Sequence, residues 1–151
     1  GSGPIRPLVR AWEALEHHDP VSRDRVTGAR VEAEVNRLTN IRASQLRKAG
    51  TPGPEGSVGK LAMAELNKAI YATVIDLQGP AGMGFSSYEM HQPKAALFGD
   101  DMAKNFLRAR ANSIEGGTTE VMKNILGERV LGLPGDVRVD KGVAWSDVAR
   151  S

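Results

Sequence analysis

The clearest alternation of apolar and polar positions lies between residues 21 and 49. Apolar side chains recur there at the spacing of one helix face, while charged side chains occupy other faces. The members of this stripe are Val31, Val35, Leu38 and, further along the same side, Leu46. Pro20 suits the first turn of a helix, and Asp19 is a good N-cap. We therefore predict a long amphipathic helix from about Val21 to Ala49.

Glycine and proline divide the neighbouring segments into further elements. A short apolar stretch, residues 8–15, is predicted to be helical. Residues 50–56 hold two prolines and three glycines, so they form a loop. Ser57 is expected to cap the next helix, over about residues 58–77, and the glycines of residues 79–82 end it. One face of that helix carries small and apolar residues: Ala62, Leu66, Ala69, Thr73 and Leu77.

Residues 79–99 lack a clear period, and we expect a long connection there. Aromatic side chains are expected to order part of it by docking on the helices: Phe85, Tyr88 and Phe98. Asp100 or Asp101 is predicted to cap another helix, which ends near Ser113. The residues expected to face inward from that helix are Met102, Phe106 and Ala109.

A short last helix follows a glycine pair. Gly116 and Gly117 break the preceding helix, and Thr118 is predicted to cap a helix from Thr119 to about Leu131. Glu120 is well placed in the first turn, where the helix dipole favours a negative charge.

These elements, with few aromatic residues and many strong helix formers, predict an all-α fold. We expect a four-helix up-down bundle over residues 4–135, followed by a C-terminal tail over residues 136–151. Val143 and Trp145 are the expected anchors of that tail. Residues 1–3, Gly-Ser-Gly, are interpreted as a scar of recombinant expression.

Charge and composition narrow the classes of function. Residues 1–60 carry 10 basic and 7 acidic side chains (+3), and residues 61–151 carry 10 and 11 (−1). The helix over residues 21–49 is rich in arginine, but acidic residues are interleaved and no aromatic side chain offers a stacking platform, so a solvated face is favoured over a nucleic-acid surface. The chain has no cysteine and no apolar run of membrane-spanning length. These features predict a cytoplasmic protein with no nucleic-acid partner and no membrane span.

One segment, residues 114–120, combines residue types that can carry chemistry. Amide groups at the start of a helix bind anions, and glycines let a ligand approach the backbone closely. Glu115 would lie beside such a ligand, where desolvation raises a carboxyl pKa toward that of a general base. The alternative interpretation is a simple turn between two helices, with Glu115 exposed. Spacing alone favours that alternative.

Four segments resemble a known family. Residues 113–134, SIEGGTTEVMKNILGERVLGLP, closely resemble the end of acyl-CoA dehydrogenases, especially those of actinobacterial type. Residues 54–61, PEGSVGKL, and 77–82, LQGPAG, are similar to a helix-opening motif and a glycine motif of the same family, in the same order. The tail segment 140–148, DKGVAWSDV, is also similar. The resemblance runs from about residue 20 to the end of the chain.

This resemblance implies a fold and an activity. The family has an N-terminal helical domain, a middle β-domain and a C-terminal four-helix bundle, and this chain resembles the bundle alone. FAD lies between the middle domain and the bundle, and its ADP part reaches a neighbouring subunit. A glutamate removes the α-proton of an acyl-CoA thioester while the β-hydrogen leaves as hydride to the flavin. Fatty, branched and steroid side-chain acyl groups are all compatible with the segment present, and the implied electron acceptor is an electron-transfer flavoprotein.

The resemblance also implies cofactor contacts. The family's Gly-Thr pair falls on Gly117 and Thr118, next to Gly116, and Thr118 would contact the flavin phosphate or ribityl chain. Glu120 takes the position of a polar flavin contact. The remaining cofactor positions fall on Asp76, Gly79 and Gly82. Asp76 stands where many members carry glutamine, so it would place a negative charge near the pyrophosphate.

The position of the catalytic base stays open between three interpretations. In many members the base directly precedes Gly-Thr, and that position is Gly116 here. Glu115 lies one residue earlier and is the candidate base within this chain. In the second interpretation the base lies on an upstream helix, outside this chain. In the third the subunit has no catalytic activity of its own. The resemblance also implies a homo- or hetero-oligomer, either a dimer or a tetramer. The alternative to an active dehydrogenase is a non-catalytic partner subunit or a helical oligomerisation module of the same family.

Overall fold

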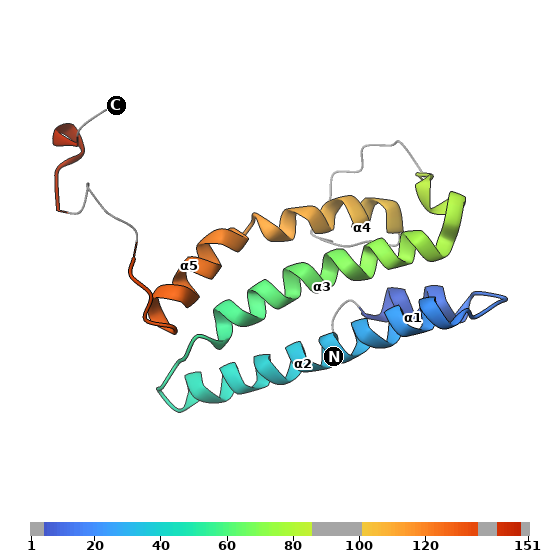
Figure 1. Cartoon of the computed structure of the whole chain (residues 1–151), viewed down its shortest axis with the longest axis horizontal. Coiled ribbons are helices and arrows are strands. Elements are labelled where there is room, and N and C mark those ends of the chain that lie inside the picture. Colours follow the sequence, from blue (N-terminus) through green and yellow to red (C-terminus); the bar gives the residue numbers. More distant parts are fainter. Residues whose placement is uncertain (1–4, 86–100, 136–141, 149–151) are drawn as a thin grey trace.

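The computed structural model describes residues 5–85, 101–135 and 142–148. Within these ranges all regular structure is helical (Figure 1). The five α-helices are α1 (Ile5–Glu13), α2 (Pro20–Lys48), α3 (Glu55–Gln78), α4 (Met102–Ala109) and α5 (Thr119–Arg129). Three short 3₁₀ helices accompany them: η1 (Gly79–Met83), η2 (Arg110–Ser113) and η3 (Trp145–Asp147). The all-α prediction is confirmed, and the five α-helices of the described residues correspond to the short helical stretch and the four longer helices that were expected.

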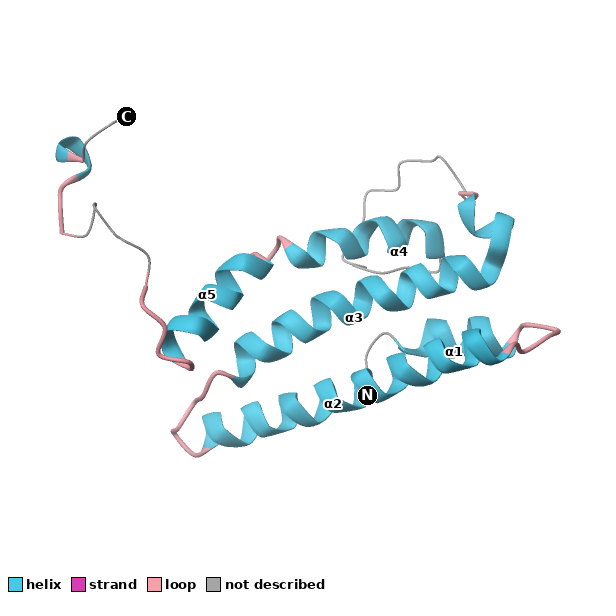
Figure 2. Ribbon diagram, viewed as in Figure 1, coloured by secondary structure: helices cyan, strands magenta, loops and turns pink. Residues whose placement is uncertain are grey.

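Helix α3 is the centre of the fold and contacts α1, α2, α4 and α5 (Figure 2). It runs antiparallel to α2 on one side, and α4 and α5 follow one another along its other side. Ile70 and Val74 of α3 and Leu8 of α1 have no exposed surface, and Leu66 and Val26 join the same core cluster. The position of α3 decides where the candidate site residues lie, because most of them are on α3 or on segments packed against it.

Helix α2 begins as predicted but buries a different face. The Asp19 side chain accepts a hydrogen bond from the Ser22 amide, as an N-cap does. Three of the four residues of the predicted stripe, however, face solvent: the exposed fractions of Val31, Val35 and Leu38 are 58%, 58% and 52%. The fourth, Leu46, is partly buried. The buried residues of α2 are Val26, Ala33, Asn36 and Ala43. Small side chains on this face let α1 and α3 approach closely, which a row of larger side chains would prevent.

The other helix boundaries agree with the sequence in part. Asp101 and Thr118 are N-caps of α4 and α5, and Glu120 lies in the first turn of α5, as predicted. Ser57 is not an N-cap, because α3 begins at Glu55 and Ser57 already lies in its first turn. On the predicted face of α3, Leu66 and Thr73 are buried and Leu77 is partly buried, whereas Ala62 and Ala69 are exposed. On α4, Ala109 is buried as expected, Met102 and Phe106 are partly buried, and Asn105 is buried as well.

Several expectations fall outside the described residues. These are the docking of Tyr88 and Phe98, the alternative cap Asp100, residues 1–3 and the first part of the tail. Phe85 and Val143 are described and remain 44% and 43% exposed, so burial does not anchor the tail at Val143. None of the helices in the described ranges is long and apolar enough to cross a membrane.

Candidate functional site

The candidate site lies where the chain turns from η2 into α5. Gly116 and Gly117 take φ values of 64° and 98°, which favour glycine because other residues are strained there. The turn delivers Thr118 to the N-cap position, where its hydroxyl oxygen accepts a hydrogen bond from the Val121 amide at 3.2 Å. The hydroxyl keeps its own proton for donation, and the amides of the first turn have no partner within the helix. The turn therefore presents several donors in one place.

A lysine from α3 holds this turn in position. The Lys60 ammonium donates hydrogen bonds to the Asn112 carbonyl at 2.9 Å and to the Gly117 carbonyl at 2.5 Å. The two carbonyls lie on either side of the turn, so one partly buried cation closes it and ties it to α3. Hydrogen bonds from a charged donor are about twice as strong as neutral ones. Lys60 is thus the main link between the glycine pair and the core helix.

A chain of polar side chains continues from α3 to Glu115. The Asn67 amide, on a buried residue of α3, donates to the Asn112 side-chain oxygen at 3.1 Å. Asn112 in turn donates to Glu115 Oε1 at 2.7 Å. Arg108 binds both oxygens of the same carboxylate, at 3.0 and 2.7 Å. Glu115 is exposed, yet three hydrogen bonds fix the direction of its carboxylate.

These contacts lower the pKa of Glu115, whereas the sequence led us to expect a raised pKa. The Arg108 guanidinium and the Asn112 amide hold the pKa of the Glu115 carboxyl below its usual range, and the charge of Lys60 acts in the same direction. The expectation that desolvation raises this pKa is wrong for this conformation, because the side chain is solvent-exposed and paired with a cation. The pairing with Arg108 therefore keeps Glu115 ionised and makes it a weaker base than an unpaired carboxylate.

The second set of predicted cofactor residues lies at the other end of α3. The Asp76 carboxylate is paired with the Arg25 guanidinium of α2 at 2.7 Å, and Arg25 also donates to the Thr73 hydroxyl at 3.3 Å. Gly79 takes a φ of 57° where α3 ends. Gly82 borders a cavity of about 330 Å³ between the end of α3 and the start of α4. The negative charge expected of Asp76 is therefore balanced within the chain.

The structure brings the predicted residues together in two groups rather than one. Gly116, Gly117, Thr118 and Glu120 lie around the Lys60 clamp with Glu115, while Asp76, Gly79 and Gly82 follow the last turn of α3. Sixteen residues of helix separate Lys60 from Asp76, a distance of about 24 Å at 1.5 Å per residue. The two groups of one chain are therefore too far apart to contact the same part of one ligand.

The residues of the first group fit an anionic oxygen such as a flavin phosphate. Thr118 offers an amide and a hydroxyl, and position 117 accepts only glycine, because a Cβ there would come within 2.6 Å of the Met122 methyl. The Thr119 hydroxyl is buried and has no hydrogen-bond partner within the described residues. An unsatisfied buried hydroxyl next to free helix amides is a donor for an additional acceptor.

The sequence interpretation missed the residues that support the turn. Lys60 lies within the quoted segment 54–61 but had no role there, and Arg108, Asn67 and Asn112 were not considered. The sequence did contain one signal for Lys60, because it is a lysine on a helix otherwise rich in small and apolar residues. Its partners lie 52 and 57 residues further along the chain, so no local pattern identifies them.

The fold and the glycine-threonine turn define an all-helical domain whose short last helix is capped by the threonine. Residues 12–131 match the family described as "Acyl-CoA dehydrogenase, C-terminal domain". The match covers most of the chain, and the chain belongs to this family.

Curated relatives agree with this family. The chain is 28% identical over 120 residues to acyl-CoA dehydrogenase IpdE1 of Mycolicibacterium smegmatis, a match that covers 80% of the chain and 27% of that protein. It is 29% identical over 131 residues to acyl-CoA dehydrogenase IpdE1 of Mycobacterium tuberculosis, covering 87% and 31%. The chain thus spans less than a third of the length of these relatives.

Two solved structures share the fold. The Tcur3481–Tcur3483 steroid ACAD superposes with a TM-score of 0.65 at 18% identity, covering 85% of this chain and 35% of that one. The ChsE4–ChsE5 complex from Mycobacterium tuberculosis superposes with a TM-score of 0.65 at 23% identity, covering 91% and 36%. At these identities the likeness concerns the fold, and it confirms the predicted fold class.

Proposed function

We propose that this chain is the C-terminal helical domain of a flavin-dependent acyl-CoA dehydrogenase that introduces an α,β double bond into an acyl-CoA thioester. In that role it supplies part of the FAD site and part of the subunit interface. The observation that carries the proposal is the turn before α5, where Lys60 holds the glycine pair and Thr118 caps the helix beside the unpartnered Thr119 hydroxyl. Bound FAD supplies the hydride acceptor for this chemistry.

The two groups of residues have separate tasks in this proposal. Thr118, next to Gly117, holds the phosphate or ribityl part of one flavin, and Glu120 offers a polar contact beside it. The group at Asp76, Gly79 and Gly82 contacts the ADP part of a second flavin, bound by a neighbouring subunit. The distance of about 24 Å along α3 supports this division, since each end of the helix then serves a different flavin.

Glu115 is the candidate base within this chain. To remove the α-proton, the Glu115 carboxylate has to break its contact with the Arg108 guanidinium and turn toward the α-carbon of the thioester. Arg108 is then the positioning residue that keeps the carboxylate ionised until substrate arrives. The catalytic role of Glu115 stands apart from the cofactor role of Thr118, and the two need separate tests.

A non-catalytic partner subunit is the second candidate function. The bidentate pair with Arg108 supports it, because a carboxylate with a lowered pKa is a weak base. The relatives of similar fold include the ChsE4–ChsE5 complex, which contains two different subunits. In this version the turn still serves a flavin while the base lies elsewhere.

Both versions can be tested on the full-length enzyme that contains this domain. Thr118→Val is expected to lower the FAD content after purification, whereas Thr118→Ser keeps the hydroxyl and retains FAD. Full FAD content in Thr118→Val contradicts the cofactor role. Glu115→Gln is expected to abolish bleaching of the flavin by acyl-CoA while FAD stays bound. Unchanged bleaching excludes Glu115 as the base and leaves the base on another segment or subunit.

A further inference from the structure

A buried asparagine of α3 makes a hydrogen bond that packing alone does not explain. Asn67 is 4% exposed, and its side-chain oxygen has no hydrogen-bond partner within the described residues. A buried polar atom without a partner lowers the stability of a fold, so a leucine would suit this position better if Asn67 only filled space. Its nitrogen, however, donates to the side-chain oxygen of Asn112 in η2 at 3.1 Å. This hydrogen bond distinguishes asparagine from an apolar residue of similar size.

Asn112 is held by α3 at two points. The Lys60 ammonium binds its backbone carbonyl at 2.9 Å, and the Asn67 nitrogen binds its side-chain oxygen. Lys60 and Asn67 are seven residues apart, about two helical turns, so both project from the same face of α3. The backbone and the side chain of Asn112 are therefore both fixed relative to the central helix of the fold.

The amide of Asn112 can point in two directions, and only one of them suits Glu115. A half-turn of the amide would exchange its oxygen and its nitrogen. An ionised carboxylate only accepts hydrogen bonds, so Glu115 requires the nitrogen, which donates to Oε1 at 2.7 Å. The donor on Asn67 requires the oxygen on the opposite side. Asn67 thus keeps Asn112 in the orientation that serves Glu115, whereas the reversed amide would direct its oxygen at the carboxylate.

The two carboxylate oxygens of Glu115 are held differently. Oε1 accepts a hydrogen bond from Asn112 at 2.7 Å and one from Arg108 at 3.0 Å. Within the described residues, Oε2 accepts from Arg108 alone, at 2.7 Å. When Arg108 leaves, Oε1 therefore keeps a hydrogen bond and Oε2 does not. The carboxylate can then turn about its contact with Asn112, and Oε2 is the oxygen that becomes free.

The cations near Glu115 do not supply this orientation. Arg108 of α4 and Lys60 of α3 face the carboxylate, and both lower the pKa of Glu115. Arg108 has to leave before the carboxylate can act, and Lys60 binds the Asn112 and Gly117 carbonyls rather than the carboxylate. Attraction between charges has little directional preference, whereas a hydrogen bond weakens steeply when it bends. Asn112 is therefore the group that directs Glu115 once Arg108 has moved.

We propose that Asn67 is a positioning residue for Glu115: it fixes the amide of Asn112, which holds Oε1 and leaves Oε2 to accept the α-proton. The α C–H bond breaks, its proton moves to Oε2, and its electron pair forms the new double bond as the β-hydrogen leaves as hydride to FAD. This role rests on the proposed function, because it concerns the candidate base. The hydrogen-bond chain itself needs neither flavin nor substrate, so it can be tested separately.

The first experiment measures the pKa of Glu115 in the 151-residue chain by ¹³C NMR titration, with Glu115→Gln to identify its signal. Asn67→Leu is expected to raise this pKa, because Asn112 loses its fixed orientation and donates less to the ionised carboxylate. The matched control is Asn36→Leu. Asn36 is also buried, its oxygen also lacks a partner within the described residues, but its nitrogen faces the Met63 sulfur at 3.7 Å. Equal pKa values in the wild type and Asn67→Leu, or equal shifts in both leucine variants, overturn the proposal.

A second pair of variants tests whether Asn67 acts through Asn112. Asn112→Ala is expected to raise the pKa of Glu115 at least as much as Asn67→Leu does. Adding Asn67→Leu to Asn112→Ala is expected to raise it no further, because both changes interrupt the same chain of hydrogen bonds. Asn67→Ala removes the same donor without added bulk and replaces Asn67→Leu where leucine disturbs the packing. Additive shifts in the double variant contradict the path through Asn112.

Bleaching of the flavin by acyl-CoA in the full-length enzyme tests the role in the reaction. Asn67→Leu is expected to slow bleaching about tenfold at unchanged FAD content, and the loss of rate on the acid side should begin at a higher pH. Asn36→Leu is expected to change neither. If Glu115→Gln abolishes bleaching and Asn67→Leu leaves its rate and pH profile unchanged, the positioning role is wrong. If Glu115→Gln itself bleaches normally, the candidate base fails and the positioning role in the reaction fails with it, whereas the NMR titration still decides whether Asn67 orients Asn112.

Discussion

The contact between Lys60 and the turn before α5 gives the sharpest test of how this site is built. Lys60→Met keeps the length and apolar stem of the side chain but removes both hydrogen bonds, to the carbonyls of Asn112 and Gly117. A hydrogen bond to a charged group contributes about 1.5–3 kcal/mol, and the loss of two that share one ammonium is less than additive. We therefore expect a loss of about 2–4 kcal/mol in the free energy of unfolding.

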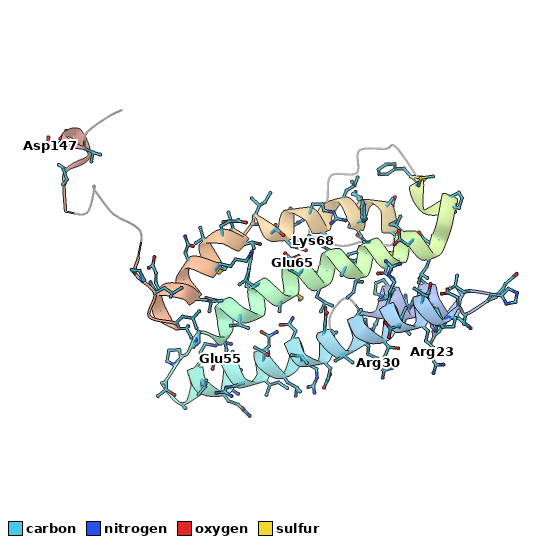
Figure 3. The ribbon with its side chains drawn as sticks, viewed as in Figure 1. Arg23, Arg30, Glu55, Glu65, Lys68 and Asp147 are labelled. Atoms are coloured by element: carbon cyan, nitrogen blue, oxygen red, sulfur yellow. The ribbon has the colours of Figure 1, made fainter. Side chains whose placement is uncertain are left out.

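The assay is thermal unfolding followed by circular dichroism, with a second lysine of α3 as the control. For a chain of this length about 1 kcal/mol corresponds to about 2–4 °C, so Lys60→Met is expected to melt about 4–16 °C lower. Lys68 pairs with Glu65 one turn away on the same helix (Figure 3), at 2.7 Å. Lys68→Met removes an ordinary surface ion pair and is expected to cost less than about 1 kcal/mol.

The location of the loss is as informative as its size. Amide hydrogen exchange in Lys60→Met is expected to rise in the first turn of α5, because the turn is no longer tied to α3. Exchange in α2, on the other side of α3, is expected to rise only as far as the global loss of stability requires, and so by less than in the first turn of α5. Equal melting temperatures for the two lysine variants, or unchanged exchange in α5, refute the view that Lys60 positions the turn.

Three further predictions concern single contacts. Thr118→Val removes the N-cap of α5 and is expected to cost about 1 kcal/mol in unfolding free energy, whereas Thr118→Ser changes it little; urea unfolding of both measures this. The lowered pKa of Glu115 means that its contribution to stability is present at neutral pH and is lost as the pH falls below the usual carboxyl range. In a series of melting temperatures from pH 7 to pH 3, Glu115→Gln is expected to remove this part of the decrease, and identical curves would contradict the prediction. Gly82→Ala brings a Cβ within 2.7 Å of a backbone carbonyl of α3, so it is expected to lower the free energy of unfolding by about 1–3 kcal/mol. Gly84→Ala makes only an ordinary contact at 3.5 Å and serves as the control. Urea titration of both variants measures the difference.

Features set by neighbours in the sequence were predictable. Asp19 and Thr118 cap helices because their side chains reach an amide three residues away. Gly116 and Gly117 mark a turn because both take positive φ. In each case the interacting groups lie within a few residues of one another, so residue type and spacing were sufficient to predict the feature.

Features set by distant contacts were not predictable. The sequence placed Glu115 beside a possible ligand and suggested a raised pKa. The Arg108 guanidinium, seven residues earlier, reaches it because η2 turns the chain between them. Lys60 closes the turn from another helix, and Asp76 is neutralised by Arg25, which lies 51 residues earlier. The electrostatics of the site thus depend on helix packing that no local pattern contains.

The buried face of α2 shows why apolar spacing alone does not identify the core. Val31, Val35 and Leu38 lie on the exposed side, while the side that packs against α1 and α3 carries two alanines and a single large apolar residue, Val26. The large apolar groups of that contact come from the partners, Leu8 of α1 and Ile70 of α3, and small residues on α2 make room for them. The search for a hydrophobic face selects the row of larger side chains, which on this helix is the row without a partner in the chain. A helix that carries two apolar faces therefore defeats a search by spacing alone, because the core is formed by the face whose shape fits the neighbouring helices.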